Sequence, residues 1–145
     1  MSDNAKSALT IKGSCHCKSI QFEVRLLDGL KTARRCTCSM CVRRGVIPVS
    51  AKLADLTITK GGAELLCYQF GTKTAGHYFC SVCGIYTHHK RRSNPELFGI
   101  NPACLEGFNI FDLESVPILD GSNHPKDNQD GQIKWIGDLT HKRRD

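Results

Sequence analysis

The sequence lacks the features of a membrane, secreted or repeat protein. No apolar run approaches the roughly 20 residues that a membrane-spanning helix needs. The first residues show no basic stretch followed by an apolar one, so we expect no signal peptide. There is also no internal repeat, low-complexity tract or long helical periodicity. We therefore expect a protein of the cytoplasm, where thiols stay reduced, with no contact to membranes.

Cysteine, in contrast, is abundant, with nine residues in a chain of 145. This length is typical of one domain with its own core, so a metal is not required merely because the chain is short. An odd number of cysteines argues against a pure disulfide framework, and metal binding explains the thiols better. We predict a single domain over residues 1–145, with a core at about 10–110 and a loop-rich C-terminal extension at 111–145.

Three of the cysteines fall within six residues, at Cys36, Cys38 and Cys41. In an extended segment Cys36 and Cys38 point to the same side, and Cys41 can reach the same point through a short turn. Three converging thiolates suit zinc. The stretch offers no obvious fourth ligand, and an open fourth position is typical of zinc sites that perform chemistry, whereas structural sites are closed.

Two further cysteine pairs complete a second group. Cys80 and Cys83 have the spacing of a zinc knuckle, and Gly84 lets the backbone pass close to their sulfur atoms. Cys15 and Cys17 supply a second pair on one side of an extended segment. Together they predict a closed four-thiolate site. Two alternatives remain, namely an exchange in which Cys41 joins the knuckle, and a redox role for the knuckle pair.

The remaining cysteines and one histidine leave other arrangements open. Cys67, Cys104 or a histidine could close the three-cysteine site and make it purely structural. Cys67 alternates with Leu66 and Tyr68 and therefore lies on the opposite face of their strand. We predict that Cys67 and Cys104 are small buried hydrophobic residues. His124, in a loop before proline, faces either a cleft or the surface.

Alternating apolar residues and turn signals predict a mostly β protein of short antiparallel strands and long, metal-pinned loops. The expected strands lie at residues 8–11, 20–24, 46–49, 56–59, 66–70, 76–79, 85–88 and 96–100. From Asp112 onward the sequence is richer in turn residues, and residues 120–125 and 130–131 are predicted to be loop. Residues 133–136, which include Trp135, the only tryptophan, are predicted to return to the body of the protein.

The cysteine motifs resemble those of the glutathione-dependent formaldehyde-activating enzyme family, to which centromere protein V also belongs. The matching stretches are Gly13-Ser-Cys-His-Cys17, Cys36-Thr-Cys-Ser-Met-Cys41 and Phe79-Cys-Ser-Val-Cys-Gly84. The resemblance covers about residues 10–110. One departure is Lys18, where the family usually has glycine after the first cysteine pair. Another is the segment 86–95, which looks characteristic of a subgroup.

The resemblance implies a tent-like, mostly β fold with two zinc ions per chain. One zinc would be structural, and the second would be associated with activity; the implied ligands are Cys15, Cys17, Cys80 and Cys83 for the first and Cys36, Cys38 and Cys41 for the second. The activity of the family is the condensation of formaldehyde with glutathione to S-hydroxymethylglutathione, and its enzymes are carbon–sulfur lyases. Because the family is diverse, membership indicates the fold and the metals more reliably than the substrate.

The open site suggests how such a reaction would proceed. A thiol that took the fourth position would ionise there and attack the aldehyde. Three thiolates make the zinc centre anionic, and nearby cations would offset that charge. Four arginines stand beside the cluster in sequence, but side chains that face alternate ways cannot all reach it. We predict Arg35 and Arg43 as contacts to the substrate carboxylates.

Two other classes of function compete with the enzyme. Seven thiolates and two zinc ions would reduce the formal charge of +6 to +3, which is only a mild basic bias. Basic runs at residues 90–92 and 142–144 could nevertheless meet nucleic-acid phosphates. Aromatic residues make up only 7% of the chain, and few stand among these charges, so base stacking has little support. A zinc-stabilised scaffold without chemistry is the third possibility.

Overall fold

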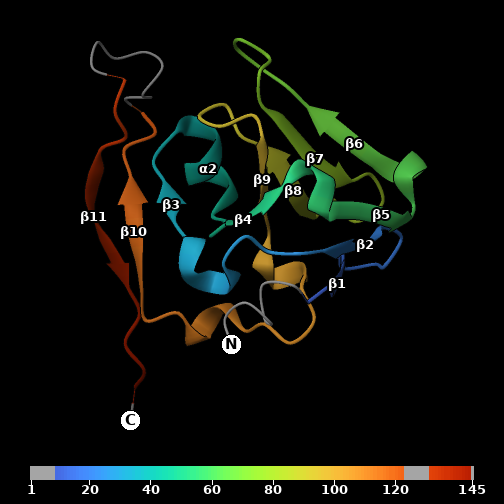
Figure 1. Cartoon of the computed structure of the whole chain (residues 1–145), viewed down its shortest axis with the longest axis horizontal. Coiled ribbons are helices and arrows are strands. Elements are labelled where there is room, and N and C mark those ends of the chain that lie inside the picture. The colour runs from blue at the N-terminus through green and yellow to red at the C-terminus, as the bar shows by residue number, and fades with distance from the viewer. Residues whose placement is uncertain (1–8, 123–130, 145) are drawn as a thin grey trace.

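The computed structural model describes residues 9–122 and 131–144, and in these it is mostly β (Figure 1). A five-stranded antiparallel sheet has the order β4-β9-β8-β7-β6, and two three-stranded sheets have the orders β1-β2-β5 and β11-β10-β3. The strands are β1 (Ile11–Ser14), β2 (Gln21–Val24), β3 (Arg35–Cys36), β4 (Val49–Lys52), β5 (Leu56–Lys60), β6 (Leu65–Tyr68), β7 (Gly76–Cys80), β8 (Tyr86–Lys90), β9 (Leu97–Ile100), β10 (Ser115–Leu119) and β11 (Trp135–Thr140).

The α-helix among the described residues, α2 (Ser39–Arg44), begins directly after Cys38. The Cys38 sulfur accepts a hydrogen bond from the Cys41 N–H and so caps the helix, and Gly45 ends it in the left-handed conformation, with φ 71°. Short 3-10 turns connect other elements; they are η1 (Gly29–Thr32), η2 (Leu53–Asp55), η3 (Gly62–Glu64), η4 (Pro102–Cys104) and η5 (Ile110–Asp112). The sequence predicts only a turn before Cys41, because six residues are too few to show a helical period.

The main hydrophobic core lies between the sheets. It takes apolar side chains from several strands and the loops between them, namely Phe22, Val24, Leu26, Ala33, Val49, Ala51, Ile100, Leu105 and Val116. Gly13 leaves room for the Phe22 ring, since a Cβ at Gly13 would lie 2.4 Å from the ring. The alternation predicted for residues 20–24 is confirmed, because Phe22 and Val24 are both buried on β2.

Two predicted strands are displaced along the chain. The first begins at Ile11, and Leu9 and Thr10 before it are not in a strand, whereas residue 8 lies outside the described residues. The strand predicted over residues 46–49 begins only at Val49, where it pairs with β9. Pro48 stands directly before it, and proline has no N–H for the ladder. The apolar residues before Pro48 are nevertheless half-buried or buried against the core.

The sequence analysis missed a pair of strands after Asp112, although residues 120–122 and 131, within the segments predicted as loop, lie outside any strand. β10 and β11 form an antiparallel pair, and β10 also pairs in parallel with β3. In Figure 1 this sheet stands at the left-hand side of the molecule, next to α2. Pro117 and Gly137 lie within these strands and obscure their pattern. The predicted return of the chain to the body is confirmed, since Trp135 opens β11 and pairs with Leu119, but its side chain remains 51% exposed.

Candidate metal centres

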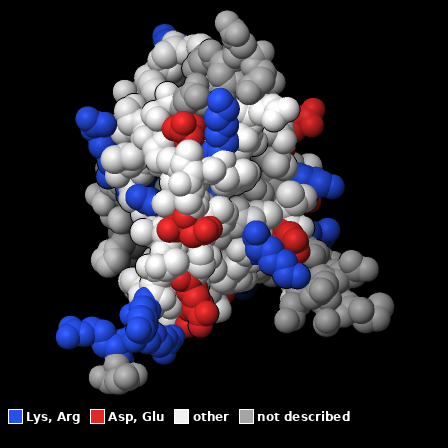
Figure 2. Space-filling model, turned by 90° about the vertical axis from the view of Figure 1, so that its left-hand side faces the viewer, with Lys and Arg blue, Asp and Glu red and all other residues white. Residues whose placement is uncertain are grey.

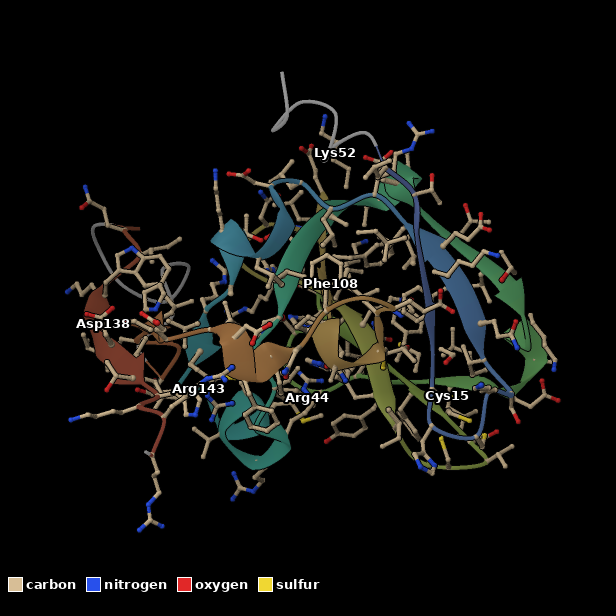
Figure 3. All side chains as sticks on the ribbon, turned by 90° about the horizontal axis from the view of Figure 1, so that it is seen from below. Cys15, Arg44, Lys52, Phe108, Asp138 and Arg143 are labelled. Carbon is tan, nitrogen blue, oxygen red and sulfur yellow. The ribbon has the colours of Figure 1, made fainter. Side chains whose placement is uncertain are left out.

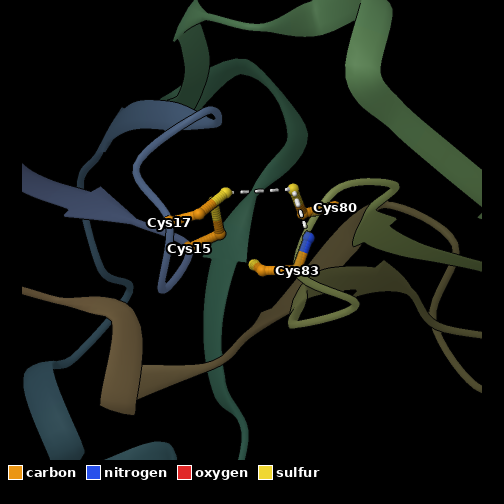
Figure 4. A group of neighbouring side chains, drawn as sticks. All are labelled: Cys15, Cys17, Cys80 and Cys83. Carbon is orange, nitrogen blue, oxygen red and sulfur yellow. Dashed lines mark hydrogen bonds between the residues drawn. The ribbon is translucent and has the colours of Figure 1, made fainter.

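The four-cysteine cluster consists of Cys15, Cys17, Cys80 and Cys83, whose sulfur atoms all lie within 4.8 Å of one another. Cys15 and Cys17 come from the turn between β1 and β2, and the other two from the end of β7 and the turn after it, so the cluster joins two distant parts of the chain (Figure 4). The sulfur of Cys17 lies 3.7 Å from that of Cys15 and 3.8 Å from that of Cys80. A tetrahedron of sulfurs about 2.3 Å from zinc has edges of about 3.8 Å, so the residues fit this metal.

The backbone supports thiolates in this cluster. The Ile20 N–H donates to the Cys15 sulfur, and the Val82 N–H donates to the Cys80 sulfur, each at 3.3 Å. Backbone N–H groups of Cys17 and Ile85 lower the pKa of Cys83 to about 6. These hydrogen bonds favour the ionised sulfur, which is the form that binds a metal.

Lys18 occupies the strained position of the first turn. Its φ is 65°, in the left-handed region that favours glycine, and its N–H donates to the Cys15 carbonyl at 3.3 Å. The glycine that the family usually has at this place would adopt the same turn without strain. The departure noted in the sequence therefore leaves the turn, and with it the positions of Cys15 and Cys17, intact.

The three-cysteine cluster consists of Cys36, Cys38 and Cys41. Cys36 ends β3, Cys38 caps α2, and Cys41 lies buried in the first turn of that helix. The Cys38 N–H donates to the Cys36 sulfur at 3.4 Å, and the Cys41 N–H to the Cys38 sulfur at 3.3 Å. Hydrogen bonds within the cluster, those between Cys36 and Cys38 first, raise the pKa of Cys36 and lower that of Cys38.

Among the described residues, the three sulfurs of this cluster have no fourth ligand beside them. In residues 9–122 and 131–144, no fourth cysteine, histidine or carboxylate shares the 4.8 Å neighbourhood of the three sulfurs. Cys67 and Cys104 belong to neither cluster. Neither residue therefore provides a fourth ligand to the three-cysteine cluster. Cys41 lies with Cys36 and Cys38 and not with the Cys80–Cys83 knuckle, so the alternative exchange does not occur. His124 lies outside the described residues.

Cys67 is exposed, so the prediction that it is buried is wrong. It lies on β6, the edge strand of the five-stranded sheet, where residues on both faces remain open to solvent. Cys104 is half-buried, and its thiol donates to the Tyr86 carbonyl at 3.7 Å.

Arg44 is the arginine that contacts the three-cysteine cluster directly. It follows Cys41 by three residues on α2, and side chains at this spacing lie on one helix face. Its Nη2 lies 3.7 Å from the Cys41 sulfur, and its guanidinium stacks over the Tyr86 ring with 3.9 Å between Cζ and the ring centroid. Figure 3 places Arg44 in the middle of the molecule and Cys15 near one edge, so the two clusters are separate.

His77 fixes the other end of the Arg44 guanidinium. Arg44 Nη1 lies 3.0 Å from His77 Nδ1. Arginine can only donate, so His77 accepts through Nδ1 and carries its proton on Nε2. Burial and the neighbouring Arg44 lower the pKa of His77 to about 4, which keeps the ring neutral at pH 7. Its buried Nε2 has no hydrogen-bond partner among the described residues, and neither has Nε of Arg44.

Two more arginines contribute positive charge to this region. Arg34 and Arg91 both interact electrostatically with Cys36 and Cys41, and burial lowers the pKa of each, that of Arg91 to about 10. Arg91 is only 5% exposed, and its Nη1 donates to the Ser50 hydroxyl at 2.7 Å. None of these arginines, nor Arg44, has a carboxylate partner among the described residues.

The two arginines predicted as substrate contacts have other neighbours. Arg35 donates to the Val46 carbonyl at 2.8 Å, and Arg43 donates to the Ser39 carbonyl at 2.9 Å on the exposed side of α2. A guanidinium has five donors, so neither bond uses up the side chain. Their role in substrate binding stays a prediction, and the arginine with a contact to a thiol is Arg44, 3.7 Å from the Cys41 sulfur.

One of the two basic runs that could meet nucleic acid is interrupted by a buried residue, whereas residues 142–144 are exposed. Arg91 is buried, so it is not available to a phosphate backbone. Arg143 forms an ion pair with Asp112 at 3.1 Å. On the face shown in Figure 2, acidic side chains stand between the basic ones, apart from one basic group at the lower edge. Among the described residues, no helix is long and apolar enough to span a membrane.

Comparison with known proteins decides the family. The sequence model of the glutathione-dependent formaldehyde-activating enzymes matches residues 10–115, which hold all seven clustered cysteines. The chain belongs to this family. A solved structure of a Rhodobacter sphaeroides protein is also similar, with 57% identity and a TM-score of 0.72 over 74% of this chain and 98% of that one. The resemblance drawn from the motifs is thereby confirmed.

Membership of the glutathione-dependent formaldehyde-activating enzymes makes a formaldehyde-activating activity the broad expectation for these two clusters. Each cluster can hold a metal ion, and the donor sets suit zinc. The family match ends at residue 115, where β10 begins, so the β10–β11 pair lies beyond it.

Chelation should distinguish the two clusters of this family member. Protein purified without chelator is expected to contain about two zinc ions per chain, and a mild chelator should remove one of them first. The four-cysteine cluster has more ligands and two buried members, so it should release its zinc last. Metal analysis alongside circular dichroism follows both events. Simultaneous loss of both ions together with the fold would contradict the division.

Proposed function

We propose that this protein joins a thiol, in the first place glutathione, to formaldehyde at the three-cysteine cluster. It would then be a zinc-dependent carbon–sulfur lyase of the S-(hydroxymethyl)glutathione synthase type. In the reaction a carbon–sulfur bond forms, the carbonyl π bond breaks, and the thiol proton ends on the oxygen. The observation that carries the proposal is a cluster of three sulfurs without a fourth ligand in the described chain, set among arginines that lack carboxylate partners.

Each cluster would have its own role in this scheme. Cys15, Cys17, Cys80 and Cys83 would hold a structural zinc, and Cys36, Cys38 and Cys41 a second zinc. At the second site the metal would supply an open position that keeps a bound thiol ionised and a positive charge near the aldehyde oxygen. The three cysteines would act as ligands and not as nucleophiles.

Charge balance indicates what kind of thiol the second site accepts. Three thiolates on divalent zinc leave one negative charge, whereas Arg34, Arg44 and Arg91 together contribute three positive charges. The difference amounts to two positive charges in a region of low exposure, and uncompensated buried charge is costly. A substrate that brings a thiolate and a carboxylate would neutralise both. This favours glutathione over an uncharged thiol.

The arginines would have different roles in binding that substrate. Arg44 is held by His77 and the Tyr86 ring, so it would stay beside the Cys41 sulfur throughout. Arg43 lies on the exposed side of α2 and Arg35 begins β3, and either could pair with a carboxylate of the glutathione backbone.

Cobalt substitution tests the open position. Zinc is spectroscopically silent, whereas cobalt accepts similar ligands and its absorption reports how many thiolates surround it. With cobalt in the three-cysteine cluster, we expect a three-sulfur spectrum that glutathione converts saturably to a four-sulfur one. Formaldehyde should then reverse the change, because the thioether sulfur of the adduct is a poorer ligand than a thiolate.

The control is Cys38→Ser, which should abolish both the spectral change and the turnover. A four-sulfur spectrum before any thiol is added would mean that the chain itself closes the site. The enzymatic proposal would then fail, and a doubly metal-pinned scaffold would be the better description.

A further inference from the structure

The turn that follows β10 lies directly against the three-cysteine cluster. Leu119, the last residue of β10, stands opposite Cys36 in the parallel pairing with β3. One residue further, the Thr37 N–H donates to the Leu119 carbonyl at 3.1 Å. The family match ends at residue 115, so this contact comes from a part of the chain beyond the family model.

The hydroxyl of Thr37 ties the cluster to this turn. It donates to Asp120 Oδ1 at 3.3 Å and accepts from the Ser122 N–H at 3.2 Å. The Ser122 hydroxyl donates to the same Asp120 oxygen at 2.7 Å, which holds that carboxylate in place. Thr37 stands between Cys36 and Cys38 in the chain, so bonds that fix Thr37 also fix the spacing of two sulfur atoms.

Gly121 brings the backbone of the turn into contact with the sulfur of Cys36. A Cβ at Gly121 would lie 2.1 Å from that sulfur and 3.0 Å from the Cys38 nitrogen. The φ of Gly121 lies outside the left-handed region, so glycine is required here for space and not for conformation. The turn therefore covers one side of Cys36.

We propose that residues 119–122, here called the clamp, position Cys36 and Cys38 for the metal and close one side of the centre. A fourth ligand must then approach from another side. The proposal rests on the proposed function in taking the three-cysteine cluster as a metal centre. Thr37, Asp120 and Gly121 are positioning residues in this scheme, because they act on the metal only through the cysteines that they hold.

The decisive variant is Gly121→Ala, with Gly62→Ala as its matched control. A Cβ at Gly62 would have no neighbouring atom within 4 Å, and its φ is not left-handed, so alanine fits there. After mild chelation has removed the weaker metal, cobalt is titrated back into each protein. Gly121→Ala should bind this cobalt at least about 10-fold more weakly than the wild type, as expected when groups that orient the ligands are disturbed. Gly62→Ala should match the wild type.

A gentler pair of variants covers the case in which Gly121→Ala does not fold. Thr37→Val keeps the shape of the side chain and loses its hydrogen bonds, whereas Thr37→Ser keeps the hydroxyl. Thr37→Val should weaken cobalt binding by about 10-fold and speed amide hydrogen exchange at Ser122, and Thr37→Ser should restore both. If Thr37→Val speeds amide exchange at Ser122 but leaves the cobalt affinity unchanged, the Thr37 contact does not position the cysteines.

The outcomes separate this proposal from the proposed function. If cobalt uptake depends on the clamp but the protein shows no turnover, the clamp proposal is supported and the proposed enzymatic function is refuted. Wild-type affinity and spectrum in both Gly121→Ala and Thr37→Val would overturn the clamp while the function stood. A wild type that takes up no cobalt at the three-cysteine cluster would overturn both.

Discussion

Cys80→Ser is expected to leave the protein unfolded or insoluble. The Cys80 side chain is fully buried, and its sulfur lies 3.8 Å from that of Cys17, 63 residues earlier in the chain. A zinc site of this kind contributes on the order of 10 kcal/mol to folding in small modules, whereas whole domains are stable by only about 5–15 kcal/mol. Circular dichroism and thermal unfolding would follow the loss, and Cys15→Ser should behave in the same way.

Cys38→Ser is the matched control, because it removes a ligand from the other cluster. All three ligands there come from one short stretch, so their metal joins no distant parts of the chain. This variant should keep its circular dichroism spectrum and lose one metal ion together with activity. Equal unfolding by Cys80→Ser and Cys38→Ser would point to two structural sites instead.

Arg44→Met is expected to lower kcat/KM by about 10- to 100-fold, the usual effect of removing a group that contacts a metal ligand. The substitution takes a positive charge from beside the Cys41 sulfur and leaves His77 Nδ1 without its donor. The cobalt spectrum should shift as well, because the Cys41 thiolate loses its neighbouring charge. Arg44→Lys keeps the charge but not the planar fork, and should recover only part of the activity.

Arg43→Met separates this effect from simple substrate binding. Arg43 is the next residue back on α2 but faces solvent and donates to the Ser39 carbonyl. If it pairs with a substrate carboxylate as predicted, its loss should raise KM for glutathione and leave the cobalt spectrum of the resting protein unchanged. An Arg44→Met protein with a wild-type spectrum and wild-type kcat/KM would refute the role given to Arg44.

The cysteine clusters were the part of the site that spacing could predict. Thiols two or three residues apart converge by local geometry alone, so each pair and the three-cysteine stretch could be recognised from spacing, whereas the joining of the two distant pairs was predicted only by counting the thiols. The contact of Arg44 with the cluster could not be predicted without knowing that residues 39–44 form a helix, because Arg44 faces Cys41 through their i, i+3 spacing on α2. Six residues show no period, and the sequence therefore favoured Arg35 and Arg43. Arg91 appeared in a basic run, and its burial follows only from the packing of β8 and β9.

The strands were predictable where apolar residues alternate, as at Phe22 and Val24. The C-terminal pair was not, because Pro117 and Gly137 interrupt the pattern and β11 is exposed along its whole length. Contacts between distant segments have no local signal at all. The approach of Gly121 to Cys36 belongs to this class, since it depends on the pairing of β10 with β3.

The two clusters differ in how far apart their members lie in the chain, and this sets an order of assembly during synthesis. The three-cysteine cluster spans six residues and closes a loop of small entropic cost as soon as it leaves the ribosome. The four-cysteine cluster must wait for a knuckle 63 residues beyond Cys17. Until then Cys15 and Cys17 stand as an unpartnered thiol pair on a nascent hairpin. In the proposed scheme the three-cysteine stretch would therefore take up its metal before the four-cysteine cluster can form.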